Sequence, residues 1–383
     1  MAERVEAIVK PELLIWARKS IGLNTSLAAK KLGATEQRLI KWEKGELRPT
    51  ISQLRKMGEV YKRPIAIFYL PAPPRGFDPI KDFRQISKHE APELSSTLLY
   101  EIRRAYARRE SAIDLYKDIN SSMPPNDLLK KISTDAEIAG QEIREFLGIT
   151  YEKQKKWKTD RESFNGWRSA IESKNILVFQ ASRISANEMH GFSISKSPFP
   201  VIVVNIQDAF VWRTFTLLHE LVHIIMGREG ICDLTGTADI EVLGNAIAES
   251  ILIPKNAFLE EREFKNRKDA NWTDQEIHRL ASRYRVSAEL ILRRLHTLGR
   301  ISLSFYREKS IDYKEQAKDK MLKAKKRKGF APPDRMVLSY SGKLYSRLVL
   351  NSYHHEKISA SDVSDLLAVK LNYLSKIETA LYG

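Results

Sequence analysis

The sequence predicts a mainly α-helical protein with a small β-sheet, an α+β fold. Apolar residues recur at helical spacing along much of the chain, whereas two short runs, 176–179 and 201–204, have the continuous apolar character of buried strands. The chain has 383 residues, more than one average domain, so two or three hydrophobic cores are expected. Apolar residues make up 43% of the sequence, which is ordinary for a globular protein.

The charge balance favours an anionic partner. The formal net charge is +16, so nucleic acid is the simplest candidate, with a basic surface kept for solubility as the alternative. The single cysteine, Cys232, permits no intrachain disulfide, which suits a reducing cytoplasm. Residues 1–19 contain no long apolar core, and no segment approaches the length of about 18 apolar residues that spans a membrane. We therefore expect a cytoplasmic protein with no membrane partner.

The first segment of the chain has the pattern of a small helical bundle. Pro11 stands where a first helical turn tolerates proline, and Gly22 ends that helix. A second helix leads to Gly33, which provides a tight turn, and Thr35 can cap the helix that follows. Helix, glycine turn and capped helix is the arrangement of a helix-turn-helix, whose second helix enters the major groove of DNA.

Residues 28–33 and 40–45 resemble the Cro/C1 (XRE) repressor family, and the resemblance covers roughly residues 11–70. It implies a partner of double-stranded DNA. The residues implied to face base edges or phosphates are Gln37, Arg38 and Lys41, and those implied to touch the DNA backbone are Asn24, Thr25 and Lys44. The alternative is a bundle whose cations are only solvated. A homodimer is expected, because such readers often pair on palindromic DNA.

A connector follows the first domain. Residues 69–76 are rich in proline, so the first domain is expected to end there. Amphipathic helices are predicted at 95–119 and 135–146. The longer helix carries four arginines, Arg103, Arg104, Arg108 and Arg109. We interpret them as a solvated face of the helix. The alternative is that they support DNA binding.

The strongest chemical signal is the motif His-Glu-Leu-Val-His at residues 219–223, on a helix predicted at 212–226. Two histidines four residues apart project from one helix face, where their imidazoles can hold one ion. Imidazole and carboxylate ligands suit Zn²⁺, with one position open for catalysis. Glu220 can then act as general base on water and pass the proton to the leaving amine of a peptide bond. A chance match on a buried helix is the alternative, and the two predicted strands before the helix argue against it.

A third metal ligand is needed, and several acidic residues compete for the role. A second helix is predicted at 239–253, and Glu241 on this helix is our choice. Glu229 is the rival, because metzincins place their third ligand at that position, although Met226 stands where that family has glycine. The weaker candidates are Asp233, Asp239 and, as a structural or substrate-facing residue, His190.

These residues resemble the ImmA/IrrE family of metallopeptidases over roughly residues 166–298. The resemblance is carried by residues 199–205, 213–220, 230–233, 241, 245–246 and 252–254. It implies a zincin-like domain with Zn²⁺ as cofactor, held by His219, His223 and Glu241, and Glu220 as the catalytic acid and base.

This chain departs from the family pattern at two positions. It has Gly244 where alanine or cysteine is usual, which questions the packing there, and Val222 where glycine or serine is common, which could narrow the site. Asn245 is expected to orient Glu241 from outside the ligand set, and Cys232 is expected to be structural.

Family members of this kind cleave repressors of mobile elements or stress-response genes, and others act as regulators beside toxin genes. The resemblance therefore implies a zinc metalloendopeptidase in transcription regulation, with a regulatory protein such as a transcription factor, or the chain itself, as substrate. The alternatives are a non-proteolytic repressor whose zinc domain is a sensor, and an antitoxin-like protein that binds a toxin partner. An intact motif favours the peptidase, because a purely structural metal site would not need Glu220.

Three C-terminal stretches carry weaker signals. Residues 274–301 have helical patterns that are expected to close the peptidase domain, and the lysine-rich run 314–328 is interpreted as a phosphate-binding segment or a solvated linker. Residues 358–378 repeat the apolar spacing of residues 32–43 at one constant offset, which hints at a second, degenerate helix-turn-helix. A packing or dimerisation module is favoured there, because the outward face lacks a comparable set of cations.

The predicted organisation has four parts. They are a helix-turn-helix domain at 1–75, a helical connector at 76–160, an ImmA/IrrE-like zinc metallopeptidase domain at 161–305, and a basic linker with a helical C-terminal module at 306–383.

Overall fold

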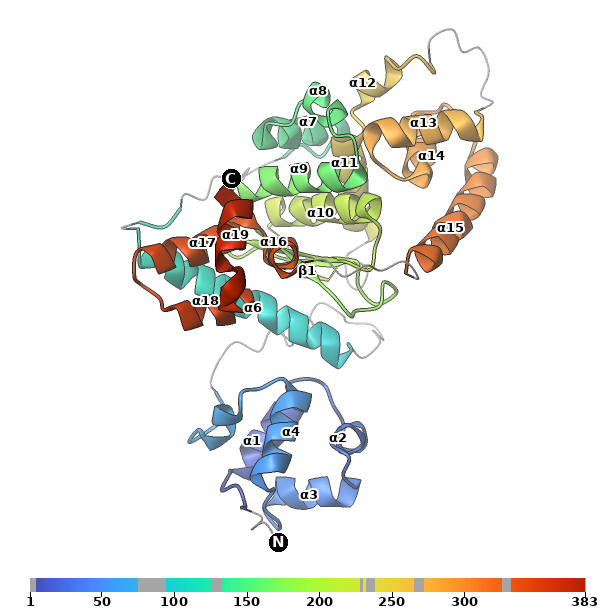
Figure 1. Cartoon of the computed structure of the whole chain (residues 1–383). Helices are drawn as coiled ribbons and strands as arrows, with labels where there is room; N and C mark the ends of the chain where they lie inside the picture. Colours follow the sequence, from blue (N-terminus) through green and yellow to red (C-terminus); the bar gives the residue numbers. More distant parts are fainter. Residues whose placement is uncertain are drawn as a thin grey trace. The chain divides into compact units, whose positions relative to one another are not determined.

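The computed structural model describes residues 5–74, 94–120, 122–124, 132–227, 230–231, 238–264, 272–325 and 332–382. These residues are mostly helical and contain one small sheet, which confirms the α+β class (Figure 1). The chain divides into two compact units, Met1–Tyr106 and Ala107–Gly383. None of the described helices is long and apolar enough to cross a membrane.

The first unit is a bundle of short helices. In chain order they are α1 (Pro11–Lys19), α2 (Thr25–Leu32), α3 (Glu36–Lys44), α4 (Ile51–Tyr61), the 3₁₀ helix η1 (Ile65–Tyr69) and the start of α6 (Ser96–Lys117). Asn24 caps α2 and Thr35 caps α3, each by accepting a hydrogen bond from a backbone N–H of the first turn. Gly33 ends α2 in the left-handed region, at φ 66°, and so makes the tight turn before α3.

A buried ion pair joins α1 to α3. Arg18 Nε and Nη2 donate to the two carboxylate oxygens of Glu43 at 2.6 and 2.7 Å, and Nη1 donates to the Leu23 carbonyl at 2.7 Å. The hydrogen bond to Glu43 raises the pKa of Arg18. Because both side chains are buried, removing one partner would strand the other charge, at a cost of about 3–5 kcal/mol. The pair therefore fixes α3 on the core of this unit.

The second unit is built around a four-stranded sheet. Its strands are β1 (Leu177–Ala181), β2 (Gly191–Ile194), β3 (Val201–Asn205) and β4 (Gly230–Ile231), in the order β1-β3-β2-β4. β1 runs parallel to β3, and β2 runs antiparallel to β3 and to β4. Every residue of the first three strands is buried, so both faces of the sheet are covered.

The helices of the second unit precede, interrupt and follow the sheet. They are the end of α6, α7 (Ala136–Leu147), α8 (Tyr151–Lys155), α9 (Asp160–Glu172), α10 (Phe210–Ile225), α11 (Ala238–Leu252), α12 (Lys255–Leu259), α13 (Asp274–Tyr284), α14 (Ala288–Thr297), α15 (Leu303–Lys325), α16 (Pro333–Ser341), α17 (Lys343–His354), α18 (Ala360–Leu367), η2 (Leu371–Tyr373) and α19 (Leu374–Tyr382). Buried residues of α7, α9, α10, α11, α13 and α14 form one hydrophobic core with β1 and β3.

A polar network holds the end of α11 in this core. Arg144 Nη1 donates to the Ile251 carbonyl at 2.6 Å and to Gln154 Oε1 at 2.8 Å. Gln154 Nε2 donates in turn to the carbonyls of Leu252 and Tyr284 at 3.0 and 3.2 Å. The last carbonyls of a helix have no partner within the helix, so these donors satisfy groups that would otherwise be buried without one. They anchor the helix that carries Glu241.

Two arginines that the sequence suggested were solvated are buried. Arg108 and Arg109 of α6 are 8% and 6% exposed. The Arg108 guanidinium lies 5.0 Å from the ring of Phe179 and 5.8 Å from that of Tyr345, and Arg109 donates to the Pro198 carbonyl at 2.9 Å. The prediction was wrong for these two residues, because aromatic faces and backbone carbonyls stabilise a guanidinium away from water.

The C-terminal helices belong to the packing of the second unit. α16 packs against β1, the strand at one edge of the sheet. Arg168 of α9 donates to the Val178 carbonyl of β1 and, at 2.7 Å, to the Ser339 carbonyl of α16. Gly342, at φ 79°, lies so close to the buried pair of Arg168 and Glu172 that an added Cβ would overlap the glutamate.

The segment predicted to repeat the N-terminal motif has a similar local geometry. α18 ends with Ala368 in the left-handed region at φ 52°, as α2 ends with Gly33 at φ 66°. Ser359 caps α18 as Asn24 caps α2. The helical segment that follows differs, because it begins with the 3₁₀ helix η2.

Candidate metal centre

The motif histidines lie on α10, which packs against β2, β3 and α11. Every residue from Leu217 to Ile225 in the second half of this helix is buried, and six of these nine residues are apolar. A helix segment that is mostly apolar and buried belongs in a core rather than on a surface. His219 and His223 are thereby held on one face of a fixed helix, 5% and 8% exposed.

Three candidate ligands converge at this face. His219 Nε2 and His223 Nε2 are 2.9 Å apart. Glu241 Oε2 is 3.3 Å from His219 Nε2, and Glu241 Oε1 is 3.4 Å from His223 Nε2. The ligand atoms of the three residues all lie within 4.8 Å of one another. The structure thus brings together the two motif histidines and the acidic residue chosen from the next helix.

This donor set fits a zinc ion. Ligand atoms placed tetrahedrally at a Zn–N distance of about 2.0–2.1 Å lie about 3.3 Å from one another. The two distances from Glu241 match that value, and the distance between the imidazoles is slightly shorter. Two imidazole nitrogens and one carboxylate also leave a fourth position for water or substrate. Without the ion, the hydrogen bond from His219 and the charge of both rings when they are protonated lower the pKa of Glu241.

Two neighbours fix the imidazole of His219. A Cβ added to Gly244, on α11, would lie 3.3 Å from Cε1 of His219, so the glycine lets α11 approach the ring closely. On α10, the ring of Phe215 stacks on the imidazole with centroids 6.1 Å apart. The glycine at position 244 is therefore compatible with the site, because it leaves space at the ring.

Glu220 lies on the side of α10 that faces β2. Its side chain is fully buried. A Cβ added to Gly191 would lie 3.3 Å from Glu220 Oε1, 3.0 Å from the Val203 carbonyl and 2.5 Å from Cγ2 of Thr216. Only glycine allows the strand and the helix to come this close. This role of Gly191 was not predicted, because no strand was predicted at this position.

Among the side chains that the structure describes, no other candidate ligand joins this cluster. His190 Nδ1 lies 3.0 Å from the buried carboxylate of Asp208, which favours a structural role. Among the described residues, Asn245 makes no hydrogen bond to Glu241. Glu229, Cys232 and Asp233 lie outside the described residues, and so does the side chain of Asp239.

The six predicted DNA contacts all lie in the first unit. Gln37, Arg38, Lys41 and Lys44 of α3 are exposed. The guanidinium of Arg38 lies 5.5 Å over the ring of Trp42. Asn24 uses its side-chain oxygen to cap α2, and the Thr25 hydroxyl donates to Glu36.

Residues 171–296 match a family model described as IrrE N-terminal-like domain, of the peptidase family M78. The match runs from the end of α9 into α14 and includes both motif histidines, Glu220 and Glu241. It supports the resemblance of this segment to the ImmA/IrrE peptidases. The comparisons found no match among proteins of curated function or among solved structures.

Proposed function

We propose that the chain is a DNA-binding transcriptional regulator whose second unit is a zinc-dependent endopeptidase. The observation that carries this proposal is the convergence of His219, His223 and Glu241, with the buried Glu220 on the same helix as both histidines. The match of residues 171–296 to a peptidase family supports it. When bound, zinc would polarise the scissile carbonyl and make water more acidic.

The groups of the chain divide the work in this proposal. The imidazoles of His219 and His223 hold the ion through Nε2, and Glu241 adds one negative charge to the ligand set. The Glu220 carboxylate takes a proton from the attacking water and returns it to the nitrogen of the leaving amine. Its burial against β2 limits the positions that the carboxylate can occupy, which favours a fixed geometry for both transfers.

The metal is tested first, by elemental analysis of the purified full-length chain. Wild type is expected to hold one zinc ion per chain, and His223→Ala and Glu241→Gln should each lose most of it, because three protein ligands are needed for tight binding. His190→Ala is the matched control and should keep its zinc, since this histidine pairs with Asp208 outside the cluster. An equal zinc content in all four proteins would exclude the proposed metal site.

The chemistry is tested with Glu220→Gln, which is isosteric with glutamate but cannot act as base. This variant should keep its zinc and lose cleavage. Because the substrate is a restricted regulatory protein in this proposal, the measurement is a comparison of new protein N-termini in cells that express wild type or the variant. The control is Glu260→Gln, because Glu260 is exposed and follows α11 and α12 in the chain. New N-termini that persist in Glu220→Gln would remove Glu220 as the base.

The DNA-binding half rests on the capped α3, with its exposed cations, and on the net charge of +16. Binding sites are first selected from random duplex DNA with the wild-type chain. Arg38→Ala should then lower affinity for the selected site, by about 1–3 kcal/mol if Arg38 reads a guanine. Arg300→Ala, an exposed arginine of the second unit, should not change it. Failure of the wild type to enrich any sequence would count against this half alone.

A further inference from the structure

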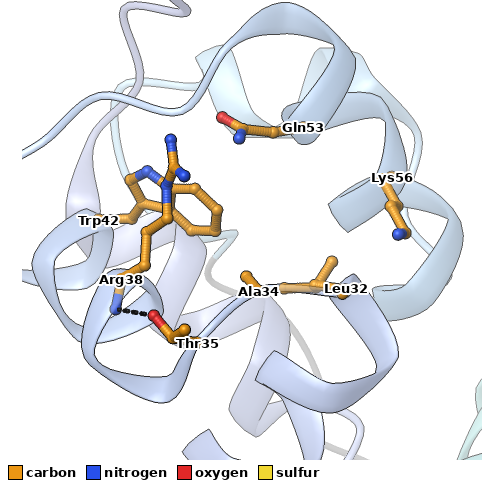
Figure 2. A pocket seen from close by; sticks show the side chains of 8 residues that line it. Leu32, Ala34, Thr35, Arg38, Trp42, Gln53 and Lys56 are labelled. Atoms are coloured by element: carbon orange, nitrogen blue, oxygen red, sulfur yellow. Dashed lines mark hydrogen bonds between the residues drawn. The ribbon is translucent and has the colours of Figure 1, made fainter.

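A cavity of about 220 Å³ opens in the first unit between α3, α4 and the turn after α2 (Figure 2). Its lining consists of Leu32, Gly33, Ala34, Thr35, Arg38, Trp42, Gln53 and Lys56. Sites for drug-sized ligands measure about 300–1,000 Å³, and one water occupies about 30 Å³ of liquid. The cavity is therefore the size of one small ring compound with a polar substituent.

The charges around the cavity have one sign. Arg38 comes from α3 and Lys56 from α4, and no carboxylate belongs to the lining. Within the part of the chain that the structure describes, neither cation forms an ion pair. A Cβ on Gly33 would lie 3.1 Å from Lys56 Nζ, so the glycine lets this ammonium reach the turn. Two cations without counter-charges at one hollow favour an anionic ligand.

Hydrogen-bonding groups at the rim are held in place by helix caps. Gln53 Oε1 accepts the Thr50 N–H at 2.8 Å as part of the capping box of α4, which fixes the amide and leaves its NH₂ group as a donor. Figure 2 shows this amide beside the hollow, opposite Leu32 and Ala34. Thr35 accepts the Arg38 N–H at 3.3 Å, and so fixes the start of the helix from which Arg38 projects.

The remaining wall of the cavity is mostly apolar. Trp42 is only 3% exposed, and the Arg38 guanidinium lies 5.5 Å from its ring centroid. Leu32 and Ala34 continue this wall. The guanidinium lies over the indole, so a planar ring in the cavity would contact the guanidinium together with Leu32 and Ala34, because arginine also stacks on aromatic rings. The lining thus combines a place for a ring with a place for a negative charge.

We infer that this cavity binds a small planar organic acid, with its carboxylate between Arg38 and Lys56 and its ring against Leu32 and Ala34, next to the Arg38 side chain that covers Trp42. Because Arg38 is also a proposed DNA contact, a bound acid would hold this side chain over the cavity and weaken operator binding. The effect on operator binding rests on the proposed DNA-binding function, whereas the binding of the acid does not.

Binding is tested on the full-length chain with benzoate as the probe. The protein is labelled with 5-fluorotryptophan, and the ¹⁹F resonance of Trp42 is assigned as the one missing in Trp42→Phe. Benzoate should shift this resonance with saturation, and the neutral analogue benzamide should not. Arg38→Gln and Lys56→Gln should each weaken benzoate binding at least tenfold, which is the loss of one charge-assisted contact of about 1.4 kcal/mol or more. Lys31→Gln is the matched control on α2, outside the lining, and should bind benzoate as wild type does.

Several outcomes would overturn the inference. Equal binding of benzamide and benzoate, or full binding by Lys56→Gln, would exclude the charge pair as the recognition element. Saturable binding of inorganic phosphate, with none of benzoate, would make the cavity an oxyanion site that needs no ring and so point to a DNA phosphate. If benzoate binds but leaves the affinity for the selected DNA unchanged, the coupling to DNA fails alone. If the chain binds no DNA even without benzoate, the proposed function fails, and the cavity is judged by the ¹⁹F result.

Discussion

At the scale of single residues, the candidate site depends on glycines as much as on ligands. Gly191 lets β2 approach Glu220, and Gly244 lets α11 approach His219. Neither residue carries chemistry, and neither was singled out for this role from the sequence. The metal ligands could be predicted because a spacing of four residues on a helix places two side chains together. A close approach between a strand and a helix depends on the tertiary fold, so the spacing of residues along the chain does not encode it.

Gly191→Ala should lower stability by about 1–3 kcal/mol, the usual cost of overpacking a core. The added methyl would meet Cγ2 of Thr216 at 2.5 Å. Thr216→Ser removes that methyl group, so the double variant should regain part of the loss, while the close contact with the Val203 carbonyl at 3.0 Å remains. Thermal unfolding of the four proteins measures this, with zinc content as a second readout. If the stability losses of the two single variants simply add in the double variant, the clash does not involve Thr216.

At the scale of elements, helices with long apolar periodicity could be predicted and short or irregular elements could not. The helices predicted at 212–226 and 239–253 are observed as α10 and α11, with ends shifted by one or two residues. β2 was not predicted, because four residues beginning with glycine carry too little pattern. The buried arginines of α6 were misjudged for a related reason, since a guanidinium is polar in sequence but its partners, Phe179 and Tyr345, come from distant segments.

The link between α13 and α15 should be sensitive to acid. Asp274 accepts a hydrogen bond from Tyr313 at 2.7 Å and lies 3.0 Å from Lys309 Nζ, and these two contacts lower its pKa. A carboxyl whose pKa is lower in the folded state adds stability above its unfolded pKa and loses it as pH falls through the folded pKa. Wild type should therefore be slightly more stable than Asp274→Asn at pH 7, and this difference should be lost at an acidic pH below the lowered pKa of the folded state.

Thermal unfolding of the metal-free proteins at both pH values measures the difference. The carboxylate is half exposed, so the effect is small and needs a matched control, for which Asp312→Asn, exposed on α15, is suitable. A stability difference that persists unchanged at low pH would show that the carboxylate charge does not hold the two helices together.

At the scale of the whole molecule, the C-terminal helices are part of the second unit rather than an addition to it. The sequence separates residues 306–383 from the peptidase domain by a lysine-rich run, whereas the chain packs α16 on β1 and places Gly342 against the pair of Arg168 and Glu172. The general succession of a capped helical bundle, a sheet with the motif helix and a helical end could be predicted. The return of the chain to the sheet edge could not, because it depends on contacts between residues about 170 positions apart in sequence.

Two glycines with positive φ provide a matched test of this packing. Alanine at Gly299, φ 66°, would meet no atom within 4 Å, so Gly299→Ala should cost only the backbone strain of about 1–2 kcal/mol. Alanine at Gly342, φ 79°, would also overlap the buried Glu172 and crowd the Val178 carbonyl. Gly342→Ala should therefore lower the thermal transition of the second unit clearly more than Gly299→Ala does. Equal effects would mean that the C-terminal helices contribute little to that unit.

The hydrogen bond from Arg168 to the Val178 carbonyl has a consequence for solubility. β1 is an edge strand of its sheet, and edge strands offer backbone groups to which a strand of another molecule can add. Here an arginine side chain and α16 occupy that side of the strand. The fold thereby covers this edge of the sheet, so that strands of other molecules cannot easily add there and form aggregates.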